Sequence, residues 1–236
     1  MRALQERVAP VTLAREHTRP VPQPLAPLFA AGGLPNGQVV GLRGTGSWSI
    51  GLALAGTALG DDGWMAVVGV DDLGLLAAAE YGVRLDRLLL VESPPADQLA
   101  TVLAALVETI DLVAIAPHRD LTHAHARRLA AKCRERGTNL LLLDGGRRWP
   151  LAPDLTITTT PEHWEGVGHG HGHLQWRQLA VTALGRRSAA RTRQVSVLAP
   201  GPGGGLAELP ESQPAPDPTD RSAETLPGAE TAASVA

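Results

Sequence analysis

Short apolar runs alternate with longer amphipathic segments from residue 25 to residue 199. The run Asn139–Leu143 is continuously apolar after its first residue, as in strands buried on both faces of a sheet. Residues 95–109 instead place apolar side chains at i, i+3, i+4 and i+7, the spacing of a helix that packs on a sheet. The pattern predicts strands at residues 38–42, 64–70, 87–91, 111–116 and 139–143, and helices at 49–59, 73–81, 95–109 and 122–136.

The rhythm changes after Asp144, where strand-like segments follow one another without intervening helices. These segments are residues 155–159, 173–184 and 193–198. Helices between strands favour parallel pairing, and consecutive strands favour antiparallel pairing. We therefore expect an α/β fold with a mainly parallel sheet that finishes in antiparallel C-terminal strands.

Three regions are predicted along the chain. Residues 1–24 contain four prolines and read as an N-terminal arm, and residues 25–199 form the α/β domain. Residues 200–236 are rich in Pro, Gly and Ala, which predicts a disordered tail. Residues 201–236 carry six acids against Arg221, a net charge of −5, so the remainder is about +2 within a total of −3.

The composition narrows the class of protein. Cys133 is the single cysteine, so neither an intrachain disulfide nor a thiolate zinc site is expected. No apolar stretch approaches the roughly 20 residues of a membrane helix, and the N-terminus lacks a signal-peptide pattern. These features predict a cytoplasmic protein without a membrane association. Lys132 is the only lysine among 21 basic residues, a bias typical of a GC-rich genome.

A strand, a glycine turn and a helix at residues 38–59 form the context of a phosphate-binding P-loop. That motif needs G-x-x-x-x-G-K-[ST], whose lysine neutralises the phosphates and whose hydroxyl holds Mg²⁺. Counting from Gly44, Ile50 takes the place of the lysine; counting from Gly46, Leu52 does. Neither register supplies a cation or a magnesium ligand. The degenerate motif consists of Gly44, Gly46, Ser47, Trp48, Ser49, Ile50 and Gly51.

The magnesium-binding acid of such sites is also missing. It lies at the end of a neighbouring strand, but residues 112–115 run into Ala116, and Asp111 stands at the opposite end. Two independent losses predict that the chain is not an enzyme and binds no cofactor, although weak nucleotide binding by backbone N–H groups stays an alternative.

These residues resemble the RecA family. Residues 28–40, with Gly32-Gly33-Leu34-Pro35-Asn36-Gly37, are similar to the turn that leads RecA into its P-loop strand. Residues 64–91 and 126–143 resemble later strand–helix units of RecA, so the resemblance covers about residues 25–199. It implies a RecA-like P-loop NTPase fold with a degenerate nucleotide site. An acid near Val70–Asp72 leaves the position of RecA's catalytic glutamate undecided, and the two DNA-contacting loops are short, at residues 117–121 and 145–153.

A short RecA-like chain without a working P-loop is similar to the ImuA group, in its RecA-fold (ImuA-prime) form. That resemblance implies a non-catalytic accessory protein in the SOS response to DNA damage. Its partners would be an inactive Y-family polymerase homologue (ImuB type) and an error-prone C-family polymerase, in translesion synthesis. RecA domains assemble through an N-terminal arm and an edge strand, so residues 1–24 or the antiparallel end of the sheet are the expected contacts. A residual NTP-binding regulator, including a SulA-like cell-division inhibitor, is the alternative.

A second alternative is direct binding of single-stranded DNA. Arginines with a tryptophan as a stacking surface could follow a phosphate backbone; in a chain with almost no lysine, arginine also marks ordinary solvated turns. The candidates are Arg147, Arg148, Trp149, Arg177, Arg186, Arg187, Arg191 and Arg193.

Two further features have more than one interpretation. His163, His169, His171 and His173 alternate with glycines and read as a solvated turn with no metal, since neither acid nor thiol completes a defined ligand set. Trp48 is expected to fill the vacated nucleotide pocket, or else to contact a partner.

Overall fold

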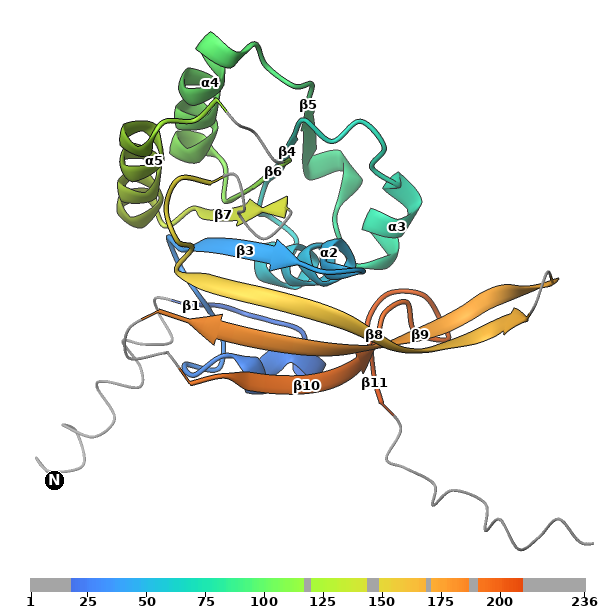
Figure 1. Ribbon diagram of the computed structural model, residues 1–236. Helices are drawn as coiled ribbons and strands as arrows, with labels where there is room; N and C mark the ends of the chain where they lie inside the picture. Colours follow the sequence, from blue (N-terminus) through green and yellow to red (C-terminus); the bar gives the residue numbers. More distant parts are fainter. Residues whose placement is uncertain (1–17, 117–119, 144–148, 169–170, 187–190, 210–236) are drawn as a thin grey trace, which may run out of the picture.

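The computed structural model describes residues 18–116, 120–143, 149–168, 171–186 and 191–209. Its centre is a nine-stranded sheet in the order β11-β10-β9-β8-β3-β7-β6-β4-β5 (Figure 1). The six strands from β8 to β5 are parallel to their neighbours, and β9, β10 and β11 pair antiparallel. The expected α/β class, with a mainly parallel sheet and antiparallel C-terminal strands, is confirmed.

The parallel strands are short, and all of them except the edge strand β5 are almost wholly buried. They are β3 (Val39–Arg43), β4 (Met65–Val68), β5 (Leu88–Val91), β6 (Leu112–Ile115) and β7 (Asn139–Leu142). β3 lies between β7 and β8, so it has hydrogen-bonded neighbours on both sides. This central position explains why every residue of β3 except Arg43 is buried.

Helices cover the two faces of this sheet. On one face, α2 (Ser47–Leu59) and α3 (Leu75–Glu80) pack with a core that includes Val40, Leu42 and Val67. On the other face, α4 (Ala96–Thr109) and α5 (His123–Arg136) pack on alternate strand residues such as Val39 and Val68. The consecutive residues Val39 and Val40 thus point to opposite faces, as strand geometry requires. Thr122 caps α5 by accepting a hydrogen bond from the His125 N–H.

The antiparallel strands continue the sheet beyond the helices. They are β8 (Leu155–Gly168), β9 (His171–Gly185), β10 (Arg193–Leu198) and β11 (Ala207–Glu208). β8 pairs with β3 only as far as Thr158, and β9 pairs with β10 only from Gln178 onward. Beyond these points, in the described part of the chain, residues 162–168 of β8 and 171–176 of β9 have no strand beside them except β9 and β8 themselves. We call this two-stranded extension the ribbon, and it projects away from the body of the protein (Figure 1).

The two predicted boundaries differ from the structure. Part of the expected arm belongs to the domain, because β1 (Thr18–Arg19) pairs with β2 (Leu34–Pro35) and the 3-10 helix η1 begins at Gln23. Residues 200–209, assigned to the tail by composition, complete the sheet through β11. Residues 1–17 and 210–236 lie outside the described residues.

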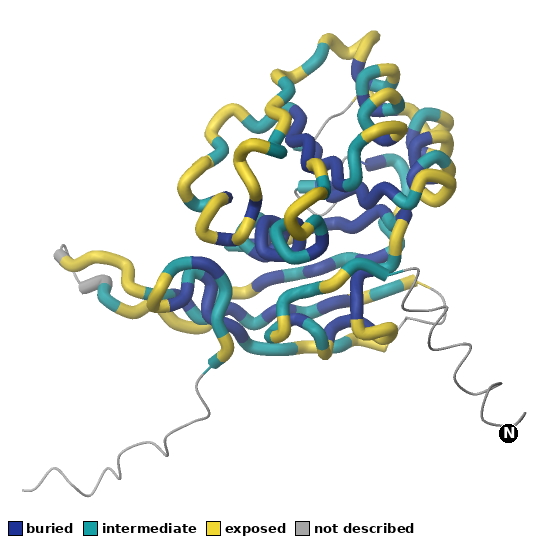
Figure 2. Tube along the Cα trace, turned by 180° about the vertical axis from the view of Figure 1, so that it is seen from behind, coloured by how far each residue is buried: buried dark blue, intermediate teal, exposed yellow. Residues whose placement is uncertain are grey.

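Many exposed residues lie on the ribbon and on the outer sides of the helices and their connecting loops (Figure 2). Five leucines are exposed around the β5 edge of the sheet: Leu75, Leu76, Leu85, Leu89 and Leu90. Within the described part of the chain, no helix is both long and apolar enough to span a membrane.

Candidate functional site: a glycine turn closed by an arginine

The turn after β3 has the backbone form that its glycines allow. Gly44 and Gly46 adopt φ angles of 92° and 82°, which only glycine takes without strain. The Ser47 N–H donates to the Gly44 carbonyl at 3.2 Å, so one N–H at the start of α2 is used within the turn. We call residues 44–46 the glycine turn. It occupies the position in which a P-loop would present its N–H groups to phosphate.

Strand β8 holds the glycine turn from one side. The Thr159 hydroxyl lies 2.8 Å from the Thr45 carbonyl oxygen and 3.3 Å from that of Arg43. A β-carbon on Gly44 would lie 2.1 Å from the Thr159 carbonyl oxygen, so the two backbones are in direct contact. The turn is thus packed against its neighbour strand.

Arg177 of β9 closes the turn from the other side. Its terminal nitrogen would lie 2.6 Å from a β-carbon on Gly46, so the guanidinium rests against the glycine backbone. The same group donates to the Ala199 carbonyl at 2.8 Å, and a second nitrogen lies 3.4 Å from the Ser49 hydroxyl oxygen. Arg177 is only 8% exposed. This side chain fills space beside the first turn of α2.

The electrostatics of Arg177 are unusual for a buried cation. Among the described residues, no carboxylate forms an ion pair with it. Burial lowers the pKa of the guanidinium, although the group stays charged at neutral pH. Helix N-termini repel cations, so α2 does not stabilise this charge. The Trp164 ring, 5.2 Å from the guanidinium carbon, supplies a compensating cation–π contact.

Tyr81 lies beside this arginine and is equally buried. Burial raises the pKa of its hydroxyl; Ser49 and Arg177 act in the opposite sense. Within the described part of the chain its hydroxyl has no partner in hydrogen-bond geometry, Ser49 included. The guanidinium that contacts the glycine turn therefore has a neutral phenol near it, and both side chains are shielded from solvent.

The first turn of α2 is packed tightly against the core. Ile50, in the lysine position counted from Gly44, is fully buried in the core. A β-carbon on Gly51, in the hydroxyl position, would lie 2.5 Å from the Leu42 side chain. Trp48 is half-buried and packs against the same core. The side chain that contacts the glycine turn from β9 is that of Arg177, whose burial was not predicted from the sequence.

The residue that follows β6 is Ala116, as the sequence indicates, and the nearby acids lie elsewhere. Ala116 follows β6 and uses its N–H to bind the Val68 carbonyl. Asp111, at the opposite end of β6, binds the Arg19 guanidinium at 3.1 Å and the Trp64 N–H at 3.0 Å, a structural role. Asp71 and Asp72 are exposed in the turn after β4.

The structure does not assemble the DNA-binding candidates into one exposed surface. Arg147, Arg148 and Arg187 lie outside the described residues. Trp149 is 8% exposed within the core under α5, so the expected stacking surface is corrected to a core position. Arg177 is also buried, so its side chain is not available to contact a DNA strand. Arg186, Arg191 and Arg193 line a cavity at the other end of the sheet.

The described histidines lie on paired strands and not in a turn, although His163 and His173 are exposed to solvent as expected. His163 lies in β8, where its ring packs near Trp176 and its Nε2 is 3.1 Å from a Glu165 oxygen. His171 and His173 lie in β9, and His169 is outside the described residues. Among the described residues, no group of three potential ligands is close enough to hold a metal ion.

Comparison with known proteins gives two matches. The family model described as the MT3502 N-terminal domain matches residues 27–151, more than half of the chain. A protein of Mycobacterium tuberculosis named "Uncharacterized protein Rv3395c" is 40% identical over 113 residues. The aligned part covers 48% of this chain and 54% of that relative, so the match spans about half the length of each. By the extent of the family match, the chain belongs to the MT3502 N-terminal domain family.

Proposed function

We propose that the chain is a non-catalytic RecA-like accessory protein that binds an inactive Y-family polymerase homologue and supports error-prone translesion synthesis. The observation that carries the non-catalytic part is the glycine turn, closed by Arg177 and followed by the buried Ile50. A phosphate cradle needs open N–H groups and a reachable lysine, and this turn offers neither a lysine nor free space beside Gly46.

The RecA-like assignment is supported by the sheet and its connections. A glycine turn follows β3, the strand between β7 and β8, and leads directly into α2. The resemblance to RecA is carried by residues 28–40, which run from the end of η1 through β2 into β3, and by residues 64–91, which run from β4 through α3 to β5. The mycobacterial relative also agrees with the GC-rich source that the arginine bias indicates.

The ribbon is the surface that best suits a protein partner. Trp164 and Leu174 are 44% and 41% exposed there, and the ribbon edges have no further strand beside them in the described structure. Unpaired strand edges and exposed large apolar side chains are both features of protein-binding elements. With neutral histidines, the ribbon's charged side chains are the two acids Glu162 and Glu165, which does not favour DNA. This choice places the partner at the antiparallel end of the sheet.

Co-purification tests the proposal. The full chain is co-expressed with the inactive Y-family homologue encoded in the same genome, and with an active Y-family polymerase as the control bait. We expect a complex with the inactive homologue that survives size-exclusion chromatography without added nucleotide, and none with the control. Separate elution of the two proteins overturns the proposal.

A further inference from the structure

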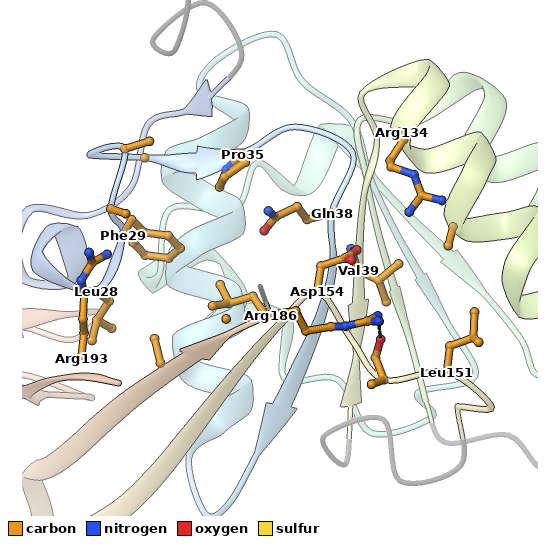
Figure 3. Close-up of a pocket in the computed structure, with 18 of the residues that line it drawn as sticks. Leu28, Phe29, Pro35, Gln38, Val39, Arg134, Leu151, Asp154, Arg186 and Arg193 are labelled. Atoms are coloured by element: carbon orange, nitrogen blue, oxygen red, sulfur yellow. Dashed lines mark hydrogen bonds between the residues drawn. The ribbon is translucent and has the colours of Figure 1, made fainter. Parts of the chain in front are cut away.

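Figure 3 shows a cavity, with a volume of about 610 Å³. It lies at the start of β3, whereas the glycine turn follows the end of that strand. It is formed where β3 begins, where the chain enters β8, and where β9 ends and β10 starts. Its volume is within the range of sites that hold small ligands or short peptide segments. None of the residues of the glycine turn lines it.

Five arginines surround this cavity, which we call the arginine cavity. Arg127 and Arg134 come from α5, seven residues apart and so on one face of the helix, and Arg186, Arg191 and Arg193 come from the β9–β10 region. Arg186 donates to the Ala152 carbonyl at 2.7 Å. The guanidinium groups of the other four make no hydrogen bond or ion pair with any described residue.

The remaining wall of the arginine cavity is mainly aliphatic. Leu28, Val39, Leu151 and Leu155 contribute to it, and Phe29 is 7% exposed. The one acid of the lining, Asp154, accepts a hydrogen bond from the Val39 N–H at 3.1 Å and so is already engaged. This lining is complementary to a ligand that carries carboxylates beside an aliphatic side chain, because guanidinium groups bind carboxylates in a bidentate way. Exposed aromatic faces for stacked bases are absent from the described lining, because Phe29 and Trp149 are buried.

We propose that the arginine cavity binds the C-terminal segment of this same chain, residues 210–236, with Leu226 on the aliphatic wall and the nearby carboxylates on the arginines. The segment carries five acids against Arg221, a net charge of −4. Glu224 stands two residues before Leu226, and Asp220 and Glu230 stand within six residues of it. Residues 1–17, the other long stretch outside the described structure, carry a net charge of +1 and lack this complementarity.

The segment is long enough to reach the cavity. The described chain ends at Leu209, just after β11, which pairs with the end of β10 at Leu198. Arg193 begins β10, so the cavity lies one six-residue strand away, about 20 Å. The fifteen residues that follow Leu209, up to Glu224, can span about 50 Å when extended. Because the two sites are on one chain, even a weak contact is favoured by a high effective concentration.

A spin label placed in the segment of the full-length chain tests this proposal. Ala223→Cys supplies the attachment point, and the native Cys133 does not compete, because it is fully buried and burial raises its pKa to about 12. We expect the label to broaden the backbone amide signals of Gln38, Leu151 and Gly185, which line the cavity. Signals near Leu76 and Leu90, at the far edge of the sheet, should be unaffected.

Substitutions of exposed arginines on α5 provide both the test and its control. Arg127→Gln with Arg134→Gln should abolish the broadening, as should high salt, whereas Arg128→Gln, which does not line the cavity, should leave it intact. Broadening confined to residues next to Leu209, or unchanged by the double substitution, overturns the proposal. A third result also overturns it: the label leaves the amide signals of the cavity residues unchanged, and a single-stranded oligonucleotide shifts them. The cavity would then bind nucleic acid. The proposal does not depend on the polymerase partner.

Discussion

The guanidinium of Arg177 rests against the backbone of Gly46, with a terminal nitrogen 2.6 Å from the place of a β-carbon on that glycine. The contact joins β9, late in the chain, to the glycine turn after β3. In the proposed RecA-like fold, this side chain takes the place of the phosphate that such a turn would bind. Both residues are therefore expected to matter for stability more than for any chemistry.

The substitution Gly46→Ala tests this contact. The alanine would pay about 1–2 kcal/mol for the positive φ angle and about 1–3 kcal/mol more for displacing Arg177. Gly32→Ala is the matched control, because Gly32 has a φ of 71° and nothing within 4 Å of its would-be β-carbon. Urea unfolding should show a clearly larger loss of stability for Gly46→Ala, and equal losses in the two variants would contradict the contact.

Nucleotide should not stabilise the protein. Ligand bound at 100 times its Kd raises the free energy of unfolding by about 2.7 kcal/mol, which is readily seen as a higher Tm. We expect the Tm of the full chain to be the same with and without millimolar ATP and Mg²⁺, because the lysine position holds the buried Ile50. A magnesium-dependent rise in Tm would instead favour the residual NTP-binding regulator.

The pKa of Tyr81 can be followed alone, because it is the only tyrosine in the chain. Burial raises its pKa above the usual value of 10.0, so the folded protein holds the phenol proton more tightly than the unfolded chain. The stability that this provides is fully present below pH 10 and is lost as pH rises through the folded pKa. Tyrosinate absorbance should therefore appear at higher pH in the folded protein than in urea.

The variant Tyr81→Phe completes that test. It removes a buried hydroxyl without a hydrogen-bond partner, so stability at pH 7 should be kept or slightly increased. The loss of stability above pH 10 should become smaller than in the unchanged protein. A large destabilisation at pH 7 would show that the hydroxyl makes a hydrogen bond after all.

The sequence predicts the elements of this fold well, and the reason is periodicity. The helix expected at residues 122–136 is α5 at His123–Arg136, and the strand expected at 139–143 is β7 at Asn139–Leu142. Such segments are long or continuously apolar, so burial dictates their form. The short β11 and the paired residues 18–19 lack that signal, because their strands contain only two residues each.

The ribbon and Arg177 were harder to predict for different reasons. Glycines at 166, 168, 170 and 172 weaken the strand pattern across the ribbon, so its length could not be read from composition. The burial of Arg177 did leave a trace: it shares the strand period of two with Leu179, Val181 and Ala183, all buried on one face of β9. Treating every arginine as a surface residue concealed that signal.

Hydrogen–deuterium exchange of the full chain, with and without the inactive Y-family homologue, tests the central claim most directly. The account predicts that the partner slows exchange in the ribbon, at residues 162–168 and 171–176, with little change at β5 and α3. Protection at the β5 edge with an unchanged ribbon, or no protection at any residue, would contradict it.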